Sequence, residues 1–418
     1  MRQSFSTLLC ALCTPIEKQY LSHYRNIILP RNDSKYHRSE RMREVLDRAK
    51  NLTQYETKGL TYYYNLADAH THQRQSPTQE IIIARLPELF RDAENRKQSD
   101  LDRTVVEAYH QLSFQHRAIE VGGTLICYSA SVAMEIVANY LRRHFLSTAL
   151  IEPTFDNIAD ILKRHGIHLV PLDDGILNKE DFTATLADFK TEVILLTLPN
   201  NPTGTFLTKE KFQLLVNFCV EQGKLLIIDT CFRLFEPDFC YDQYQILEDA
   251  HAHYIVMEDT GKIWPTLDLK VGFLNSSKDI QSELEDIHTD LLLNVSPFIL
   301  RLITEYCADS KADNFQSIRK LIENNRAFLR AQIRDCILTL AYEHSRTSVE
   351  FLKISNAISA KDIQSYLATH GIFVLPGTYF YWNSPHLGDS FIRIALAREP
   401  KMFQEAILAM MTALSLIS

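Results

Sequence analysis

The sequence predicts an α/β protein with a large, mostly parallel sheet followed by a smaller α+β region. From residue 100 to 300, short apolar runs alternate with helical stretches, as in parallel sheets covered on both faces. The runs Val193–Leu196 and Leu225–Ile228 lack polar alternation, which is typical of strands buried on both faces. After residue 300 a long helical stretch precedes short strands and helices, which indicates a separate C-terminal region.

The expected elements follow in order along the chain. We predict strands at Thr124–Tyr128, Ala149–Glu152, His168–Pro171, Glu192–Thr197, Leu225–Asp229, Tyr254–Glu258, Val271–Leu274, Ser348–Ile354, Ile372–Leu375 and Phe391–Leu396. We predict helices at Val132–Arg142, Asn157–Gly166, Lys209–Gln222, Tyr244–His251, Pro297–Leu329 and near 360–370. The pattern divides the chain into an N-terminal extension (1–48), a segment at 49–75, a large domain (76–299) and a small domain (300–418).

Composition excludes several classes of protein. The chain has 418 residues, of which 46% are hydrophobic, so a large core needs no disulfide or metal for stability. The net charge of −8 argues against a nucleic-acid-binding protein, and the basic run at 31–50 is expected to be a solvated helix or tail. No apolar run is long enough to cross a membrane. We read the short apolar stretch Phe5–Cys13 as part of an N-terminal extension.

The eight cysteines show no disulfide framework, which favours a reducing, cytoplasmic compartment. Cys10 and Cys13 form a CxxC pair, but no second pair accompanies it, so we expect no metal site.

Four segments carry polar residues next to predicted strands. Asn201 lies in a Pro- and Gly-containing turn after one strand, and Asp229 ends the next. Lys262 and Lys270 follow a third strand, and Arg393 lies inside an apolar strand of the C-terminal region. Each alone fits a structural role: a turn, a helix cap, surface lysines or an ion pair. Their joint order favours a shared site.

In this order, residues 100–400 resemble the fold-type I pyridoxal-phosphate (PLP) enzymes, the aspartate-aminotransferase superfamily. The resemblance implies that PLP is the cofactor and that the fold is of this type. It implies Lys262 as the Schiff-base lysine and Thr260 as a further cofactor-binding residue. It also implies Asp229 at the pyridine nitrogen, Asn201 at the ring oxygen, Phe155 stacked on the ring, Ser129, Ala130 and Ser131 at the phosphate, Lys270 in place of a phosphate-contacting arginine, and Arg393 as the clamp for the substrate α-carboxylate.

The residue types suit this chemistry. A lysine amine forms an imine with an aldehyde when burial or cationic neighbours lower its pKa. A buried carboxylate keeps a pyridine nitrogen protonated, so that the ring accepts electrons. A helix N-terminus binds phosphate through its N–H groups, and arginine binds a carboxylate through two of its N–H groups.

Longer segments resemble the O2- and PLP-dependent L-arginine oxidases, including the hydroxylases of enduracididine-type natural-product biosynthesis and related desaturases. These segments are Tyr128–Val132, Pro153–Asp160, Glu258–Lys270 and Asp290–Pro297, together with Asn51–Glu56 and Asn65–His70, which resemble an active-site lid in segment 49–75. The resemblance implies that Thr53, Glu56 and Asp259 bind the arginine side chain. It implies His70 as a catalytic acid/base, with Asp68 orienting it or capping a helix.

Three departures from the family pattern are visible. Asp229 is followed by Thr230, Cys231 and Phe232, where the superfamily often has a tyrosine; this fits an atypical reaction better than ordinary transamination. Cys231 stands where the arginine oxidases are expected to have serine, and His72 stands where some members are expected to have arginine. Residues 1–48 have no counterpart.

The resemblance therefore implies oxidation of L-arginine with O2 as co-substrate. The expected products are 4-hydroxy-2-ketoarginine, 2-ketoarginine or a dehydroarginine, with ammonia and hydrogen peroxide, made by a homodimer. An aminotransferase or a cyclising PLP enzyme acting on arginine or hydroxyarginine is the first alternative. A transcription factor with an aminotransferase-like sensor domain would need a helix-turn-helix before residue 100, which is not evident. A catalytically inactive scaffold is disfavoured by the intact Lys262, Asp229 and Arg393.

Overall fold

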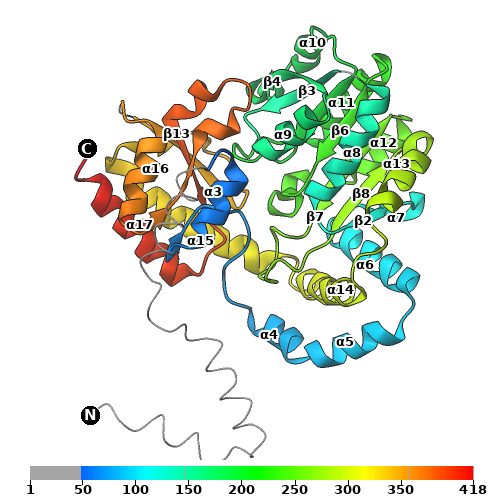
Figure 1. The fold of residues 1–418 in the computed structure, drawn as a ribbon, viewed down its shortest axis with the longest axis horizontal. Coiled ribbons are helices and arrows are strands. Elements are labelled where there is room, and N and C mark those ends of the chain that lie inside the picture. Colours follow the sequence, from blue (N-terminus) through cyan, green and yellow to red (C-terminus); the bar gives the residue numbers. More distant parts are fainter. Residues whose placement is uncertain (1–48, 146, 356, 418) are drawn as a thin grey trace, which may run out of the picture. The chain divides into compact units, whose positions relative to one another are not determined.

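The computed structural model describes residues 49–145, 147–355 and 357–417, and the elements below belong to the unit that begins at Asn51 (Figure 1). Its larger sheet has the strand order β2-β8-β7-β6-β5-β3-β4. The strands are β2 (Leu125–Cys127), β3 (Ser147–Glu152), β4 (His168–Asp173), β5 (Val193–Thr197), β6 (Leu225–Asp229), β7 (Tyr254–Asp259) and β8 (Gly272–Ser276). Neighbours from β4 to β7 run parallel, while β8 is antiparallel to both β7 and β2. The predicted mostly parallel sheet is confirmed.

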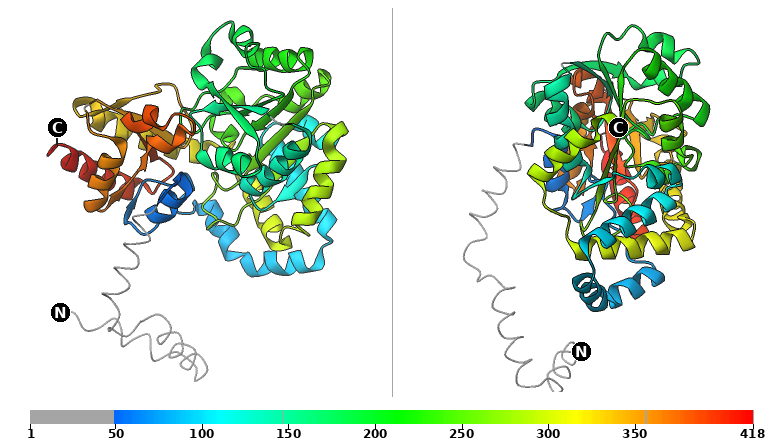
Figure 2. Two further views of the ribbon diagram at one scale, coloured as in Figure 1. Left: turned by 45° about the horizontal axis from the view of Figure 1, so that its top comes forward. Right: turned by 90° about the vertical axis from the view of Figure 1, so that its right-hand side faces the viewer.

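Helices cover both faces of this sheet (Figure 2). On one face pack α8 (Ala130–His144), α9 (Asp156–Arg164) and α13 (Lys278–Leu291), and on the other α10 (Phe182–Leu186), α11 (Lys209–Glu221) and α12 (Gln243–Asp249). The strands β5 and β6 contribute alternate residues to the two cores, so every residue from Val193 to Thr197 is buried. This burial explains why their sequences lack polar alternation.

The N-terminal part consists of helices and one short strand. These are α3 (Leu52–Gly59), β1 (Tyr64–Asn65), α4 (Pro77–Ala84), α5 (Leu86–Asn95), α6 (Gln98–Leu112) and α7 (His116–Val121). A capping box of Ser76 and Gln79, with Pro77 in the first turn, begins α4. Strand β1 pairs in parallel with β11 (Ile372–Phe373), so this early segment is joined to a late part of the chain.

The C-terminal part holds a four-stranded antiparallel sheet in the order β12-β13-β10-β9. Its strands are β9 (Leu338–Leu340), β10 (Val349–Ile354), β12 (Leu375–Pro376) and β13 (Phe391–Ala395), and its helices are α14 (Pro297–Ala312), α15 (Gln316–Gln332), α16 (Ala360–Thr369) and α17 (Pro400–Leu414).

Short 3₁₀ helices occur in both parts of the chain: η2 (Asp174–Asn178), η3 (Arg233–Phe235) and η4 (Pro237–Phe239) near the large sheet, and η5 (Ile333–Asp335), η6 (Gly377–Phe380) and η7 (Pro385–Ser390) in the C-terminal part.

Two predicted elements are wrong in detail. The single helix Pro297–Leu329 is broken between α14 and α15, where Asn314 and Phe315 adopt left-handed backbone angles. The side chain of Asp313 accepts hydrogen bonds from the amides of Gln316 and Ser317, which starts a new helix. The predicted strand Ile372–Leu375 is divided between β11 and β12, which belong to different sheets.

Several predictions concern residues that the structure does not describe. The extension 1–48, with Cys10, Cys13 and most of the basic run, lies outside the described residues. The boundaries that we place at 48/49, 75/76 and 299/300 stay a prediction. Among the helices of the described ranges, none is long and apolar enough to cross a membrane.

Candidate active site

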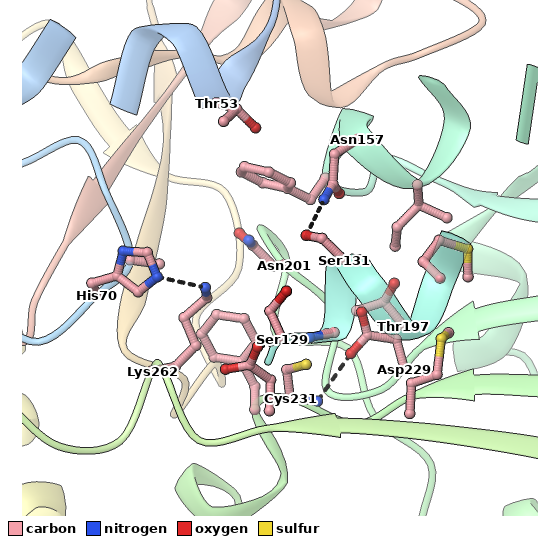
Figure 3. Close-up of a pocket in the computed structure, with 18 of the residues that line it drawn as sticks. Thr53, His70, Ser129, Ser131, Asn157, Thr197, Asn201, Asp229, Cys231 and Lys262 are labelled. Atoms are coloured by element: carbon pink, nitrogen blue, oxygen red, sulfur yellow. Dashed lines mark hydrogen bonds between the residues drawn. The ribbon is translucent and has the colours of Figure 1, made fainter. Parts of the chain in front are cut away.

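A cavity of about 210 Å³ lies where the central parallel strands end (Figure 3). Open α/β sheets bind ligands at this edge, because the loops there leave a crevice. Twelve of the fifteen predicted site residues line it: Thr53, Glu56, His70, Ser129, Ala130, Ser131, Phe155, Asn201, Asp229, Asp259, Lys262 and Lys270. Segments separated by more than two hundred residues therefore converge on one space.

Lys262 follows β7 in a tight turn. At Gly261 a Cβ atom would lie 2.6 Å from Cδ of Lys270 and 2.7 Å from Oδ1 of Asp259, so glycine lets these side chains close around the turn. Burial lowers the pKa of Lys262, but the charges of Asp259 and Glu56 outweigh it, and the pKa is raised. The predicted lowering of the Lys262 pKa is therefore wrong for the protein chain alone, because the negative charges of Asp259 and Glu56 stabilise the protonated amine.

Asp229 ends β6 and lines the cavity beside Thr197 of the neighbouring strand. The amide of Cys231 donates a hydrogen bond of 3.0 Å to Oδ1 of Asp229, which fixes the carboxylate. Burial raises the pKa of Asp229 above its usual range. A cation placed against this carboxylate would reverse that effect, so the position suits a protonated ring nitrogen.

The first turn of α8 forms another wall. Ser129 caps the helix by accepting a hydrogen bond from the amide of Val132, and Nδ2 of Asn157 donates to Oγ of Ser131 over 3.1 Å (Figure 3). At Gly272 a Cβ atom would meet the carbonyl carbon of Ser129 at 2.7 Å, so only glycine lets β8 approach so closely. The amide of Ala130 donates to Oδ2 of Asp259 over 2.8 Å, which shows that this helix end already binds an anionic group.

His70 faces Lys262 in the cavity (Figure 3), and Lys270 lies beside it. The Nζ atoms of Lys262 and Lys270 lie 3.3 Å and 3.4 Å from Nε2 of His70. The charge of Lys262, then burial, then the charge of Lys270 lower the pKa of His70 to about 2. The imidazole is therefore neutral at physiological pH and is able to accept a hydrogen bond.

A fully buried arginine holds the segment that carries His70. Arg398 donates hydrogen bonds to the backbone oxygens of Asn65 (2.7 Å), Asp68 (2.6 Å) and His70 (2.8 Å). The carboxylate of Asp68 accepts a hydrogen bond from the backbone N–H of His70 over 3.1 Å and contacts Nε2 of His72 at 2.8 Å. Asp68 thus fixes the backbone at His70, while its carboxylate also binds the side chains of His72 and of Asn65, whose Nδ2 donates to Oδ2 over 2.6 Å.

Three predicted site residues do not line this cavity. Asp68 lines an adjoining cavity of about 770 Å³, which also contacts Thr53, Glu56 and His70. Thr260 is buried, and its hydroxyl accepts a hydrogen bond from the amide of Val271. Arg393 is fully buried behind the cavity wall. The roles assigned to the site residues stay predictions.

The donor set fits the expected cofactor. Lys262 offers an amine, Asp229 a carboxylate and Asn201 an amide in the same cavity, and Phe155 adds an aromatic ring. The close contact allowed by Gly272 positions the first turn of α8, and Lys270 adds a cation near it. These are the groups needed for the aldehyde, the ring nitrogen, the ring oxygen, the ring face and the phosphate of PLP.

Sequence reasoning missed two contributors. Asn157 lines the cavity and binds Ser131, and Arg398 anchors the segment of His70. Arg398 lies five residues after Arg393, just beyond the same strand, and this spacing was the only available signal. Its partners are backbone oxygens, which leave no trace in side-chain patterns.

Comparisons with known proteins agree with this geometry. A family model described as aminotransferase class I and II matches residues 90–410. The solved structure of MppP soaked with the product 2-ketoarginine is 38% identical, with a TM-score of 0.80, and the match covers 84% of this chain and 99% of MppP. LysN, the α-aminoadipate aminotransferase of Thermus thermophilus complexed with N-(5'-phosphopyridoxyl)-L-leucine, is 16% identical with a TM-score of 0.72, covering 88% of this chain and 95% of LysN.

A curated relative is the histidinol-phosphate aminotransferase of Geobacillus thermodenitrificans (strain NG80-2). It is 24% identical over 330 residues, which is 76% of this chain and 83% of the relative. Together the family match and the superposed structures confirm the predicted fold-type I architecture.

Proposed function

Because the chain belongs to the aminotransferase class I and II family, we propose that it is a PLP-dependent enzyme that oxidises L-arginine with O2. The coarser part of this statement, a PLP-dependent enzyme of the aminotransferase type, follows from the family itself. The finer part depends on one observation: His70 and three guanidinium-binding candidates, Thr53, Glu56 and Asp259, share a cavity with Lys262. The similarity to MppP, whose product is named as 2-ketoarginine, supports the choice of substrate.

The proposed division of labour follows from these positions. PLP, when bound, supplies an electron sink for charge that develops next to the substrate nitrogen. Nζ of Lys262 would remove the proton from the α-carbon, as the base that lines the same cavity as the expected cofactor groups. Nε2 of His70 would accept the proton of a water that adds at the γ-carbon, once Lys262 no longer carries the positive charge that lowers the pKa of His70 in the free chain. Glu56 and Asp259 hold the guanidinium group, which presents a planar set of donors to carboxylates.

The two oxidative outcomes differ in stoichiometry. Forming 2-ketoarginine consumes one O2 and one water per arginine and releases ammonia and one hydrogen peroxide. Forming 4-hydroxy-2-ketoarginine consumes a second O2 and a second water and releases a second hydrogen peroxide. The ratio of O2 consumed to ammonium released therefore measures how far the reaction goes.

The test uses purified, PLP-loaded protein with L-arginine in air and no keto-acid acceptor. We expect O2 uptake, ammonium release and keto acids of the two masses. His70→Ala should lower the share of the hydroxylated product and bring the O2-to-ammonium ratio towards one, while His72→Gln, which keeps a donor for Asp68, should not. Arginine turnover without O2 uptake would contradict the oxidase proposal.

The curated relatives favour a second candidate, transamination. The same protein should therefore be assayed without oxygen, with 2-oxoglutarate as acceptor and with L-arginine or histidinol phosphate as amino donor. Acceptor-dependent glutamate formation in this assay, together with no O2 uptake when the protein is given L-arginine in air, would establish this alternative and overturn arginine oxidation.

A further inference from the structure

Arg393, the expected clamp for a substrate carboxylate, already holds a carboxylate of the chain. Its Nη2 donates to Oε1 of Glu56 over 2.9 Å and to the backbone oxygen of Ala67. Its Nη1 donates to Oδ1 of Asn201 over 3.2 Å. The Nε–H group is buried and has no hydrogen-bond partner within the described residues. The guanidinium group of Arg393 is thus paired with one carboxylate oxygen of Glu56. Its buried Nε–H group could donate a further hydrogen bond to a ligand.

Glu56 stands between this arginine and the two cavities. Arg393 is fully buried and lines neither the cavity with Lys262 nor the adjoining one, whereas Glu56 lines both. A carboxylate entering from either cavity therefore meets Glu56 first. It reaches Arg393 only when the Glu56 side chain turns away.

Moving Glu56 has a consequence for charge balance. The Glu56 side chain is 15% exposed and Arg393 is 0% exposed, so their pairing is shielded from water. A largely buried carboxylate that loses its cation is strongly unfavourable unless another cation replaces it. A ligand that carries only a carboxylate satisfies Arg393 but leaves Glu56 unpaired. A ligand that also carries a cation satisfies both.

We infer that Glu56 is an internal substitute for the substrate carboxylate on Arg393, and that exchange of this partner selects amino acids with a cationic side chain. Glu56 lies on α3 and lines both cavities, so its side chain borders both Arg393 and the space open to a ligand cation. This inference rests on the proposed function and adds to it. Selectivity arises from the cost of displacing Glu56 as well as from its attraction to the guanidinium group.

Two ligands isolate this effect. L-Lysine and L-norleucine have the same carbon chain and differ by the terminal ammonium group. Binding of each to PLP-loaded protein is measured by calorimetry under nitrogen, for the wild type, Glu56→Gln and Glu80→Gln. Glu80 is an acid that lines the adjoining cavity, so its variant controls for a general loss of negative charge.

In Glu56→Gln the neutral amide holds Arg393 weakly and needs no cation when displaced. We expect L-norleucine to bind about tenfold tighter than in the wild type, and L-lysine and L-arginine about tenfold weaker. Glu80→Gln should change each affinity by less than about twofold. Thermal melts confirm that the variants are folded, and Glu56→Asp, which keeps the charge on a shorter arm, should fall between the wild type and Glu56→Gln.

Unchanged or weaker binding of L-norleucine to Glu56→Gln would overturn the exchange, even if L-arginine binding is lost. If L-arginine binds no better than L-norleucine to the wild type, the proposed substrate fails. Tighter binding of L-norleucine to the variant would then still support displacement of Glu56 from Arg393.

Discussion

His70 is neutral because two positively charged lysines lie beside it and because it is buried. The pKa of its imidazole is lowered from 6.5 to about 2 by Lys262, burial and Lys270, in that order. The unfolded chain protonates this histidine below pH 6.5, whereas the folded chain does not. Stability that depends on neutral His70 is therefore fully present above this pH and lost as the pH falls.

We expect the free energy of unfolding to fall by about 2 kcal/mol when the pH is lowered from 6.5, the unfolded pKa of His70, to 5. The reason is that only the unfolded chain protonates His70 in this range. Urea denaturation at pH 7.5 and pH 5 measures this loss, which should be smaller in His70→Gln. His251 is an exposed histidine, so His251→Gln provides the control variant. An equal loss in the wild type and His70→Gln would show that His70 does not carry this dependence.

Gly272 is the residue that sets the distance between β8 and the start of α8. In Gly272→Ala the new Cβ would lie 2.7 Å and 2.9 Å from the carbonyl carbon and oxygen of Ser129, which cannot turn aside as a side chain can. We expect PLP affinity to fall at least about tenfold. Spectrophotometric titration of the apoprotein with PLP measures this loss. Gly166→Ala, at an open position with a positive φ, should destabilise the fold while PLP affinity stays unchanged.

At the scale of elements, α3 is fastened to α9 by one buried acid. The amide of Leu52, at the start of α3, donates a hydrogen bond of 2.8 Å to Oδ2 of Asp156. Burial raises the pKa of Asp156 to about 7, with the charges of Asp160 and Glu56 adding to the effect. The folded chain thus keeps a proton that the unfolded chain releases above pH 3.8, and this stabilisation is lost as the pH rises through 7.

Asp156→Asn should therefore gain stability relative to the wild type as the pH rises, by roughly 2 kcal/mol between pH 5.5 and pH 8, because only the unfolded wild type releases the proton of Asp156 in this range. The asparagine oxygen still accepts the hydrogen bond from Leu52. Melting curves at both pH values test this, with Asp188→Asn, at an exposed acid elsewhere in the chain, as control. An unchanged stability difference between Asp156→Asn and the wild type at the two pH values would contradict the assignment.

The elements also show what the sequence could predict. The strands β5 and β6 were predictable because burial on both faces leaves continuous apolar runs. The break between α14 and α15 was not, because Asn314 and Phe315 sit within otherwise helical sequence and their left-handed angles depend on packing. The antiparallel β8 was also hidden, since pairing direction is set by long-range contacts.

The same distinction applies to the site. Asp229 and Lys262 were predictable, because each follows a recognisable strand within a characteristic motif. The pairing of Glu56 with Arg393 and the anchoring by Arg398 were not, because they join residues more than three hundred positions apart. A functional residue within a local motif can be predicted from the sequence, whereas a charge pair between distant parts of the chain can be identified only from the structure.

At the scale of the whole molecule, two leucine side chains are almost fully exposed to solvent. Leu267 is 95% exposed and Leu293 91% exposed, and Leu267 lines the cavity that adjoins the site. Burying such side chains between two copies would be favourable, in agreement with the homodimer that the family resemblance implies.

We predict a mass near twice the 48.2 kDa of one chain by light scattering. Leu293→Asp should weaken the dimer at least about tenfold, because a buried charge would replace an apolar contact. Leu416→Asp, at a leucine that is 74% exposed elsewhere, should leave the mass unchanged. A monomeric wild type at micromolar concentration would contradict the prediction.

The pairing of β1 with β11, together with the three backbone contacts of Arg398, also bears on how the protein is made. On the ribosome the chain emerges from its N-terminus, and the large sheet is complete once β8 has been synthesised. The segment with His70 emerges early but finds its anchors only after Arg398 has been synthesised, more than three hundred residues later. The site around His70 is therefore assembled after translation has passed Arg398, well after the strands of the large sheet have been made.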